Sequence, residues 1–553
     1  MILLSQSAMV TDAEPSSLGA AAIVNGMGTG AGFDLGSLAL NSPCMPTSSQ
    51  HESPPSETLD VLIVGGGFGG LCTAIQLRRR GIRDFVILEQ AGDVGGTWQA
   101  NTYPGCACDV QSHLYSYSFE LNPDWSRAFS PQPEIEAYIR RCAERYDLKP
   151  HLRFGTRLRQ ARFDEERDEW CVEAEDGRRW RARVLVMATG GLSVPSLPAV
   201  PGLDEFKGPR FHSARWDPDY DPRGRRVAVV GTGASAIQIV PGIADQVEKL
   251  YLFQRTPPWI LPRFDRRFTR FERWLFRHCR PFMKLYRALL YWRLESRAVV
   301  FTLAPALSRL IELACRWHIR RGIKDPDLRA AVTPDYRPGC KRVLLSDDYY
   351  STLERGNVTL VPQGVRAATP EGLVAEDGSE FAVDTVVFAT GFQATHPIPA
   401  GQVLGRDGID LVERWREGAE AYKGMAVSGF PNLFLLGGPN TGLGHNSVVF
   451  MIESQVRYLM GAIAAMREAG ATRVEVRRDV EIVFNERLQR RLGRTIWSSG
   501  CNSWYLDEQG RNVTLWPGFT VEYWWRTRRF DGTAYQLSSS PGATVMAKTA
   551  RAA

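Results

Sequence analysis

The sequence predicts an α/β protein that contains two Rossmann-like dinucleotide-binding domains and a helical insertion. Two glycine-rich fingerprints carry this prediction, Gly65-Gly66-Gly67-Phe68-Gly69-Gly70 and Gly231-Thr232-Gly233-Ala234-Ser235-Ala236. Each follows a short apolar run and precedes a segment with helical patterning, which is the strand, turn and helix context of a dinucleotide-binding site. Two such sites in one chain imply two bound nucleotides.

The first fingerprint follows the apolar run 59–64, which suits a buried parallel strand, and precedes a helical pattern from Leu71 to Arg80. Its early glycines permit a tight turn close to a pyrophosphate, and its last glycine lets the helix pack on the strand. The glycines expected to shape this site are Gly65, Gly67 and Gly70. A second strand over 85–88 delivers Glu89, at the spacing where an acid accepts hydrogen bonds from a ribose. This acid indicates a dinucleotide that lacks a 2′-phosphate.

The second fingerprint repeats this context, with an apolar strand over 226–230 and a helix that is expected to start at Ala234. Its expected nucleotide contacts are Gly231, Gly233 and Ser235. After the next apolar strand come Arg255 and Thr256 in place of an acid. Because a guanidinium forms a bidentate pair with a phosphate, this ending favours NADPH over NADH. A solvated arginine at the end of a strand is the alternative.

NADPH at the second site needs an electron acceptor at the first, and FAD is the economical choice. Two further apolar strands end in Ala-Thr-Gly, at 184–190 and 386–391, and both are expected to return the chain from one domain to the other. We therefore predict a discontinuous FAD-binding domain over 59–192 and 385–553. The NADP-binding domain is expected over 193–384.

Length and composition agree with this organisation. A chain of 553 residues exceeds the usual single domain. Its formal charge of +6 is modest and no nucleic-acid-binding motif is present, so no nucleic acid is expected as a partner. Ten scattered cysteines without a secretory signal predict a reduced, cytoplasmic protein rather than a disulfide framework. No metal site is expected.

Residues 1–58 contain no Lys or Arg and are rich in Ala, Gly, Ser and Pro. This composition lacks the positive region of a signal peptide and predicts a disordered leader. No stretch of the chain reaches the roughly eighteen uninterrupted apolar residues that a membrane span requires.

Residues 263–324 form a basic segment, with 16 Lys or Arg against 4 Asp or Glu. Stretches such as 270–290 space their bulky apolar residues as an amphipathic helix does. A basic amphipathic surface suits peripheral contact with an anionic membrane. A helical insertion that packs on the nucleotide-binding domain, or that lines a substrate entrance, gives the same pattern, and both interpretations stay open.

The segment between the two fingerprints reads F-x-G-x-x-x-H-x-x-x-W-D, with fixed positions at Phe206, Gly208, His212, Trp216 and Asp217. It resembles the fingerprint of Baeyer-Villiger monooxygenases, flavoenzymes that insert one oxygen atom beside a ketone carbonyl. The related flavin-containing monooxygenases that oxidise nitrogen or sulfur have Tyr or Phe where this chain has Trp216. Further similarity to the family lies at Gly96, Thr97, Trp98, Asp109, Lys341, Arg342, Asp384 and Trp504.

The resemblance implies a reaction and a role for each matching residue. NADPH reduces FAD, the reduced flavin reacts with dioxygen to give a C4a-peroxyflavin, and attack on a ketone yields an ester or lactone. Arg342 matches the arginine beside the peroxide and Asp109 the acid that orients it, while a structural ion pair is the alternative for these two residues. Lys341 is similar to the lysine that shares the 2′-phosphate with Arg255. The residues implied as further cofactor contacts are Gly96, Thr97, Trp98, Asp109 and Trp504.

His212 lies near the linker between the nucleotide domains in the family, so the resemblance implies that it couples domain motion. A hydrogen-bonded core histidine is the alternative. For Trp216 the alternative is plain core packing.

Other functions stay open. A flavin-containing monooxygenase that oxidises an amine or thioether uses the same peroxyflavin without a carbonyl. A flavin-binding protein without turnover is disfavoured because Arg342, Asp109 and Arg255 occur together. A disulfide oxidoreductase also joins FAD and nicotinamide domains, but Cys106 and Cys108 have C-x-C rather than C-x-x-C spacing.

Overall fold

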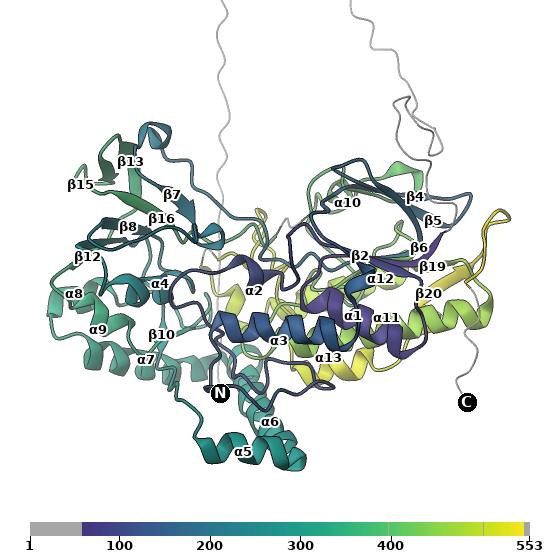
Figure 1. Ribbon diagram of the computed structural model, residues 1–553, viewed down its shortest axis with the longest axis horizontal. Helices are drawn as coiled ribbons and strands as arrows, with labels where there is room; N and C mark the ends of the chain where they lie inside the picture. Colours follow the sequence, from purple (N-terminus) through teal and green to yellow (C-terminus); the bar gives the residue numbers. More distant parts are fainter. Residues whose placement is uncertain (1–57, 396–397, 502, 547–553) are drawn as a thin grey trace, which may run out of the picture. The chain divides into compact units, whose positions relative to one another are not determined.

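The computed structural model of this chain describes residues 58–395, 398–501 and 503–546 (Figure 1). By its contacts the chain divides into Met1–Ser48 and Ser49–Ala553, and every helix and strand below belongs to the second unit. The predicted leader, 1–58, lies outside the described residues except for Thr58.

The first nucleotide-binding sheet has eight strands within the described residues. Their order is β17-β4-β5-β6-β1-β2-β3, with β18 also paired to β6. The strands are β1 (Leu59–Val64), β2 (Phe85–Leu88), β3 (Leu152–Arg153), β4 (Leu158–Asp164), β5 (Glu169–Ala174), β6 (Arg179–Met187), β17 (Val403–Leu404) and β18 (Leu433–Leu435). The neighbours from β18 through β6 and β1 to β3 are parallel, whereas β4 and β5 extend the sheet in antiparallel pairing.

Strand β1 is covered on both faces. Val61 and Ile63 pack in the same cluster as apolar residues of α1 (Phe68–Arg79), whereas Leu62 and Val64 pack with those of β4. Successive side chains of a strand point to opposite faces. A strand covered on both faces therefore has a continuous apolar run, and this explains the sequence pattern at 59–64.

Helices cover one face of this sheet. They include α2 (Thr97–Ala100), α3 (Gln132–Arg145), α11 (Val448–Ala469), α12 (Arg478–Leu492) and α13 (Thr520–Thr527) around the FAD-type domain, and Figure 1 draws α1, α3 and α11 on the same side of β2. The short helix α10 (Leu411–Arg414) packs instead in the cluster on the opposite face, through Leu411. Helix α11 is long and apolar enough to cross a membrane, yet it packs between α1 and α13 with most of its apolar window buried. We interpret α11 as a core helix. Strands β19 (Arg473–Val476) and β20 (Tyr535–Ser538) pair antiparallel beside it.

The second nucleotide-binding sheet is parallel, in the order β12-β9-β8-β16-β7. Its strands are β7 (Arg210–His212), β8 (Arg226–Val230), β9 (Lys249–Phe253), β12 (Val358–Val361) and β16 (Thr385–Phe388). The same domain contains helices α4 (Ala236–Ile243), α8 (Pro326–Ala331) and α9 (Tyr349–Leu353). It also contains an antiparallel sheet of β13 (Val365–Thr369), β14 (Gly372–Ala375) and β15 (Glu380–Ala382). A short parallel pair is formed by β10 (Ile260–Leu261) and β11 (Leu344–Leu345).

The position of β16 moves the predicted domain boundary. Residues 385–388 were expected to begin the second part of the FAD-binding domain, but β16 pairs with β8 and β7 of the second sheet. The chain returns to the first sheet only after Phe388, through the Ala-Thr-Gly segment 389–391, and β17 is the next strand of that sheet. A buried apolar strand has the same pattern in either sheet, so the sequence does not reveal which sheet it joins.

The basic segment 263–324 folds largely as helices, as its apolar spacing predicts. Helices α5 (Arg270–His278) and α6 (Arg280–Glu295) adjoin at Cys279, and a π-helical turn, Val299–Leu303, leads from α6 toward α7 (Ser308–Gly322). The side chain of Arg287 on α6 donates to the carbonyl oxygens of His113, Leu114 and Ser116, and these bonds fix α6 to the first domain.

One disulfide was not expected from the sequence. Cys340 and Cys501, 161 positions apart, are bonded to each other. The fold brings their Cα atoms to 6.2 Å, within the range for a disulfide, and spacing along the chain cannot show this proximity. Cys106 and Cys108 are buried thiols and form no disulfide in the described part of the chain.

Candidate active site

The first fingerprint forms a tight turn between β1 and α1. Gly65 has a φ of +109°, and a Cβ there would lie 2.5 Å from the carbonyl oxygen of Ala188. A Cβ on Gly70 would overlap the carbonyl oxygen of Gly65. Only glycine fits these two positions. Gly67 caps the N-terminus of α1 without a side chain, which leaves the first N–H groups of the helix open to a phosphate.

Glu89 follows β2 and is buried against this turn. Its Oε2 accepts a hydrogen bond of 2.6 Å from the N–H of Gly66, and its Oε1 accepts one of 2.8 Å from Ala91. The predicted acid therefore lies at the fingerprint. Its contact with a ribose hydroxyl stays a prediction.

The segment of Gly96, Thr97 and Trp98 lies against the same turn. A Cβ on Gly96 would lie 3.2 Å from the Cα of Gly67. Thr97 is exposed at the start of α2, whereas Trp98 is buried and donates a hydrogen bond of 3.1 Å to the hydroxyl of Tyr115. The structure thus brings this predicted cofactor segment to the first fingerprint.

The second fingerprint joins β8 to α4. Gly231 has a φ of +106°, and a Cβ there would lie 2.6 Å from the carbonyl oxygen of Ala389. Gly233 is exposed, and Ser235 caps α4, which begins at Ala236 rather than at the predicted Ala234. This turn also requires glycine, and its phosphate-facing side is open to solvent.

Arg255 and Lys341 form a positively charged corner beside the second fingerprint. Arg255 is exposed, and neither residue forms an ion pair with any described residue. Burial lowers the pKa of Lys341, and the positive charge of Arg255 lowers it further. Thr256 accepts a hydrogen bond of 2.8 Å at its carbonyl oxygen from Thr232 Oγ1, which ties the strand end to the fingerprint. The negative charge of Asp335 opposes this lowering, but neither cation is ion-paired within the described residues, and two neighbouring cations fit a 2′-phosphate.

Asp109 and Arg342 form the predicted ion pair. The Arg342 Nη2 lies 2.5 Å from the Asp109 Oδ2, and both side chains are about one-third exposed. Burial raises the pKa of Asp109, but the charge and hydrogen bond of Arg342 outweigh burial, so the net pKa is lowered. Attraction to Asp109 raises the pKa of Arg342. The pair therefore stays ionised over the whole working range of an enzyme.

Three further side chains around this pair were not predicted from the sequence. Arg263 donates a hydrogen bond of 2.7 Å to the carbonyl oxygen of Cys108, next to Asp109. Arg297, after α6, lies near enough for Asp109 to oppose the lowering of its pKa by burial. Burial raises the pKa of Tyr505 to about 12, although the charge of Arg342 lowers it. None of the three belongs to a motif, so no local pattern could have found them.

Gln238, on α4, connects the second fingerprint helix to the loop that carries Asp109. Its Nε2 donates to the carbonyl oxygen of Ala107 at 2.9 Å, and its Oε1 accepts from the N–H of Ala107 at 3.3 Å and from the hydroxyl of Tyr103 at 3.1 Å. A Cβ on Gly105 would lie 2.5 Å from the carbonyl oxygen of Gln238. The Asp109 loop thus rests directly on the NADP-type domain.

The segment that suggested the family links the two domains. His212 ends β7, and its Nδ1 accepts a hydrogen bond of 3.1 Å from Ala214. Its ring contacts Phe392, which follows the Ala-Thr-Gly crossover. Burial lowers the pKa of His212, against an opposing effect of the Gly391 backbone. His212 therefore lies at the crossover, and its role in domain motion stays a prediction.

The other fixed positions of this segment shape its fold. Phe206 and Trp216 are buried, and Trp216 contacts Phe211 at a ring distance of 5.0 Å. A Cβ on Gly208 would overlap the backbone of Asp384, and Asp217 accepts a hydrogen bond of 3.0 Å from Asp219 in a turn. These contacts are structural.

Two other predicted residues lie apart from the ion pair. Asp384 accepts hydrogen bonds from the backbone and guanidinium of Arg226, so it fixes β16 to β8. Trp504 is 43% exposed and packs on Tyr505 at a ring distance of 4.5 Å. No contact among the described residues joins Trp504 to a fingerprint, and its cofactor contact stays a prediction.

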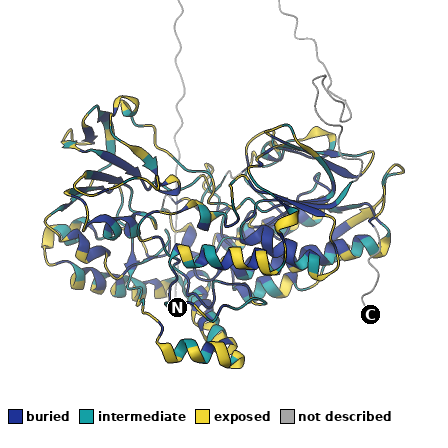
Figure 2. Ribbon diagram, viewed as in Figure 1, coloured by how far each residue is buried: buried dark blue, intermediate teal, exposed yellow. Residues whose placement is uncertain are grey.

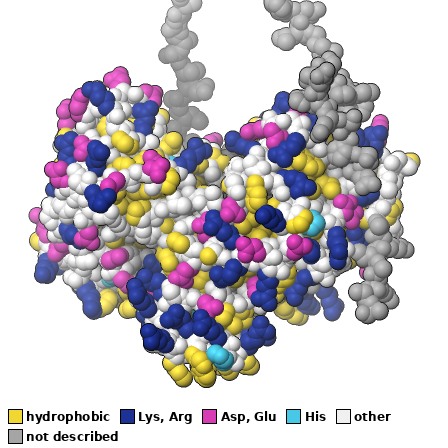
Figure 3. Space-filling model, viewed as in Figure 1, with side chains coloured by type: hydrophobic (Ala, Val, Ile, Leu, Met, Phe, Trp, Pro, Cys, Tyr) yellow, Lys and Arg dark blue, Asp and Glu magenta, His cyan; other side chains and the backbone are white. Residues whose placement is uncertain are grey.

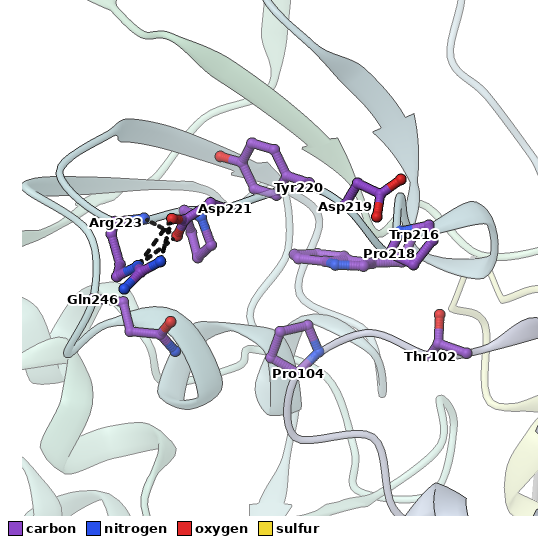
Figure 4. A pocket seen from close by; sticks show the side chains of 10 residues that line it. Thr102, Pro104, Trp216, Pro218, Asp219, Tyr220, Asp221, Arg223 and Gln246 are labelled. Carbon is purple, nitrogen blue, oxygen red and sulfur yellow. Dashed lines mark hydrogen bonds and ion pairs between the residues drawn. The ribbon is translucent and has the colours of Figure 1, made fainter.

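A surface pocket of about 790 Å³ lies between the two domains' loops. Pro104 and Thr102 lie on one side of it and Trp216 and the segment 218–223 on the other (Figure 4). Asp109 and Arg342 do not line this pocket. The pocket is thus lined by the end of the segment 206–217 and by the residues after it, and it is separate from the ion pair.

Two dinucleotide-type turns, an anion-binding corner and an ionised arginine beside them define a two-nucleotide oxidoreductase. The sequence profile of the flavin-binding monooxygenase-like family matches residues 59–300. The chain is 49% identical over 511 residues to a Baeyer-Villiger monooxygenase of Pseudomonas aeruginosa, covering 92% of this chain and 96% of that protein. It is 48% identical over 506 residues to one of Streptomyces coelicolor, covering 91% and 97%. The crystal structure of OTEMO in complex with FAD and NADP superposes with a TM-score of 0.79 at 28% identity, covering 88% and 100%.

The chain belongs to the Baeyer-Villiger monooxygenase family. The predicted family, the fold class with two nucleotide-binding domains and the assignment as an enzyme are thereby confirmed.

Proposed function

We propose that this chain uses FAD, NADPH and dioxygen to insert an oxygen atom beside the carbonyl of a small ketone, giving an ester or lactone. The single observation that carries the proposal is the ion pair of Arg342 with Asp109, whose residues come from segments 233 positions apart. A permanently charged guanidinium held by a carboxylate is the group that oxygen transfer to a carbonyl needs.

The two sites fit the two cofactors. Gly65, Gly67 and Glu89 would hold the adenosine diphosphate of FAD, because the turn has no room for a Cβ and the acid lies beside it. Arg255 and Lys341 would hold the 2′-phosphate of NADPH, since the two cations are neighbours and neither forms an ion pair with a described residue. A cytoplasmic location remains part of the proposal.

When bound and reduced, FAD supplies the chemistry that activates dioxygen. The chain's own part is electrostatic. Arg342 stabilises negative charge on oxygen as it approaches the carbonyl carbon, and Asp109 fixes the direction of the guanidinium. Because the pKa of Arg342 is raised, this residue holds its proton throughout and acts by charge rather than as an acid.

The test is the variant Arg342→Ala, studied as the holoenzyme. It should bind FAD and be reduced by NADPH at rates near those of the wild type. Its rate of ester formation should fall by roughly a hundredfold or more, the usual cost of removing a preorganised charge. Arg159→Ala, which breaks the exposed pair with Glu173 at 2.7 Å, is the matched control and should keep full activity.

Ester formation by Arg342→Ala at the wild-type rate would overturn the assignment. Paired ketone and thioether probes separate the proposal from the heteroatom oxygenase, because only the ketone oxygenase gives an ester. Substrate-stimulated NADPH and oxygen consumption excludes a flavin-binding protein without turnover.

A further inference from the structure

The helical insertion exposes an unusual amount of apolar surface. Of the 22 large hydrophobic side chains that are exposed in the described chain, twelve lie between residues 264 and 317. They are Phe264, Phe271, Trp274, Phe282, Leu285, Leu289, Trp292, Leu303, Leu307, Leu310, Leu313 and Trp317. Single exposed apolar residues are ordinary, but a concentration of this size in one segment of the chain indicates a binding surface.

Helix α6 has two apolar faces. Met283, Leu290 and Leu294 are at most 7% exposed and pack in the protein core. On another face the exposed apolar residues follow each other at spacings of three, four and three, which places them in one stripe. They are Phe282, Leu285, Leu289 and Trp292. The first face is thus buried in the protein, whereas the second face stays exposed, apart from the stacking of Phe282 on Phe276 of α5.

The neighbouring helices continue this surface. On α5, Phe271 and Trp274 are exposed and stack on each other at a ring distance of 6.1 Å. On α7, Leu310, Leu313 and Trp317 are exposed at spacings of three and four. Figure 2 shows the exposed residues along α5, at the tip of the insertion. We call the twelve exposed apolar residues of α5, α6, α7 and their connections the apolar face.

The geometry of the insertion suits the surface of a bilayer rather than a span. Residues 280–303 and 305–322 together are long and apolar enough to cross a membrane, but their axes meet at 113°. A bend of this size prevents a straight crossing. Amphipathic helices with Trp, Phe and Leu on one face lie in the boundary between headgroups and acyl chains.

The acidic side chains of the insertion are all neutralised by the protein itself. Asp265 pairs with Arg127, Glu272 with Arg266, and Glu312 with Arg316. The fourth acid, Glu295, is buried and accepts hydrogen bonds from Asn446 and Thr520. The insertion therefore presents almost no negative charge to a partner.

Most basic side chains of the insertion form no ion pair with a described residue. Nine exposed cations of the insertion form no ion pair with a described residue: Arg267, Arg270, Arg280, Lys284, Arg293, Arg309, Arg320, Arg321 and Lys324. Figure 3 shows Lys and Arg gathered around apolar side chains at the lower end of the molecule, over α5 and α6. An apolar face bordered by unpaired cations requires a partner that is apolar inside and negative at its surface.

We propose that the apolar face docks on an anionic phospholipid bilayer. A second copy of this chain fits poorly, because a symmetric contact would bring the same unpaired cations against each other. The core of a protein interface is also depleted of Lys. A bilayer accepts the apolar side chains between its acyl chains, and its anionic headgroups neutralise the surrounding cations. The exposed Trp274, Trp292 and Trp317 are side chains of the type that favours the boundary between bilayer and water.

The test measures co-sedimentation of the full-length holoenzyme with vesicles. Vesicles of phosphatidylcholine containing roughly one-third phosphatidylglycerol should bind the wild type, and pure phosphatidylcholine should bind it at least about tenfold more weakly. High salt should release the protein from the anionic vesicles. Brominated lipids should quench tryptophan fluorescence in the bound state.

Three variants make the test specific. The triple change Leu285→Ser, Leu289→Ser and Trp292→Ser should reduce binding by about tenfold or more while flavin content and ester formation stay unchanged. The matched control, Ile482→Ser, Val483→Ser and Trp525→Ser, changes exposed apolar residues outside the insertion and should bind as the wild type does. The change Arg280→Gln, Lys284→Gln and Arg293→Gln should abolish the preference for phosphatidylglycerol.

Equal binding of the wild type and the Leu285 triple variant would overturn the proposal. So would equal binding to neutral and anionic vesicles. A dimer that the Leu285 triple variant dissociates, in a protein that ignores vesicles, would show instead that the apolar face is an interface between two copies.

Discussion

The side-chain amide of Gln238 pairs with both backbone groups of Ala107, accepting from its N–H and donating to its carbonyl oxygen. Gln238 lies on the helix that follows the second fingerprint, and Ala107 lies two residues before Asp109. The position of the Asp109 carboxylate, and of the Arg342 that it holds, therefore depends on where the NADP-type domain lies. We therefore expect this contact to couple occupancy of the second nucleotide site to the geometry of the ion pair.

Gln238→Leu should uncouple NADPH consumption from ester formation. Leucine has a similar size but neither end of its side chain hydrogen-bonds, so the backbone groups of Ala107 lose their partner. We expect the ratio of ester formed to NADPH consumed to fall several-fold, with unfolding destabilised by about 1–3 kcal/mol. Gln246→Leu is the control, since Gln246 is exposed and its side chain donates a hydrogen bond to the nearby carbonyl oxygen of Gly242 rather than to Ala107. A wild-type ratio in Gln238→Leu would contradict this coupling.

Arg255→Ala should weaken selection of NADPH over NADH and shift a pH profile. Burial lowers the pKa of Lys341 and the charge of Arg255 lowers it further, so in the free enzyme Lys341 loses its proton at a lower pH than an ordinary lysine. The kcat/KM for NADPH should therefore fall at alkaline pH as Lys341 becomes neutral. In Arg255→Ala the pKa of Lys341 rises, so the alkaline fall moves to higher pH while kcat/KM for NADPH drops by roughly tenfold to a hundredfold.

The comparison with NADH separates charge from general damage. The kcat/KM for NADH should change little in Arg255→Ala, since NADH has no 2′-phosphate. An equal loss for both nucleotides, or an alkaline limb that does not move, would show that Arg255 and Lys341 do not share a phosphate.

The local parts of this site were predictable from the sequence, and the reason is steric. At Gly65 and Gly70 a Cβ would overlap neighbouring backbone, so the glycine pattern records the turn itself. Glu89 follows from the length of one strand, helix and strand unit. The position of Arg342 opposite Asp109 came only from family resemblance, because nothing along the chain relates residues 233 positions apart.

The parts that were missed depend on tertiary contacts. Gln238 and Tyr505 reach the Asp109 loop and Arg342 from other elements, and neither stands in a recognisable pattern. The strand 385–388 was assigned to the wrong domain, because its apolar run suits either sheet and only its pairing with β8 decides. The disulfide of Cys340 was missed for the same reason.

His113 should make the protein sensitive to acid. It is buried among Phe268, Phe276 and Tyr286 of the insertion, and burial together with the charge of Arg287 lowers its pKa to about 4. In the unfolded chain its pKa is about 6.5, so the unfolded state binds more protons between these values. The contribution of neutral His113 to the free energy of unfolding is therefore fully present above about pH 6.5 and is lost as the pH falls toward 4.

His113→Phe removes this proton site and keeps an aromatic ring among its neighbours. The free energy of unfolding that the wild type loses between about pH 7 and pH 5 should shrink by about 2 kcal/mol in the variant, as measured by urea unfolding at both pH values. His278→Phe, at an exposed position of α5, is the control and should leave the pH dependence unchanged. An unaltered pH dependence in His113→Phe would refute the assignment.

The disulfide of Cys340 with Cys501 should stabilise the fold and hold the ion pair in place. Cys340 precedes Lys341 and Arg342, and Cys501 lies four residues before Tyr505, whose pKa Arg342 lowers by its charge. The bond closes a long loop of chain, so Cys340→Ser should lower the free energy of unfolding by about 2–4 kcal/mol. Because Tyr505 and Arg342 are then held less firmly, more NADPH should be consumed without ester formation.

A reductant is the control for this prediction. It should reproduce both effects in the wild type and in Cys279→Ser, since Cys279 is a free cysteine. It should have no effect on Cys340→Ser, which lacks the bond. If the reductant acts equally on Cys340→Ser and the wild type, the bond does not hold this site together.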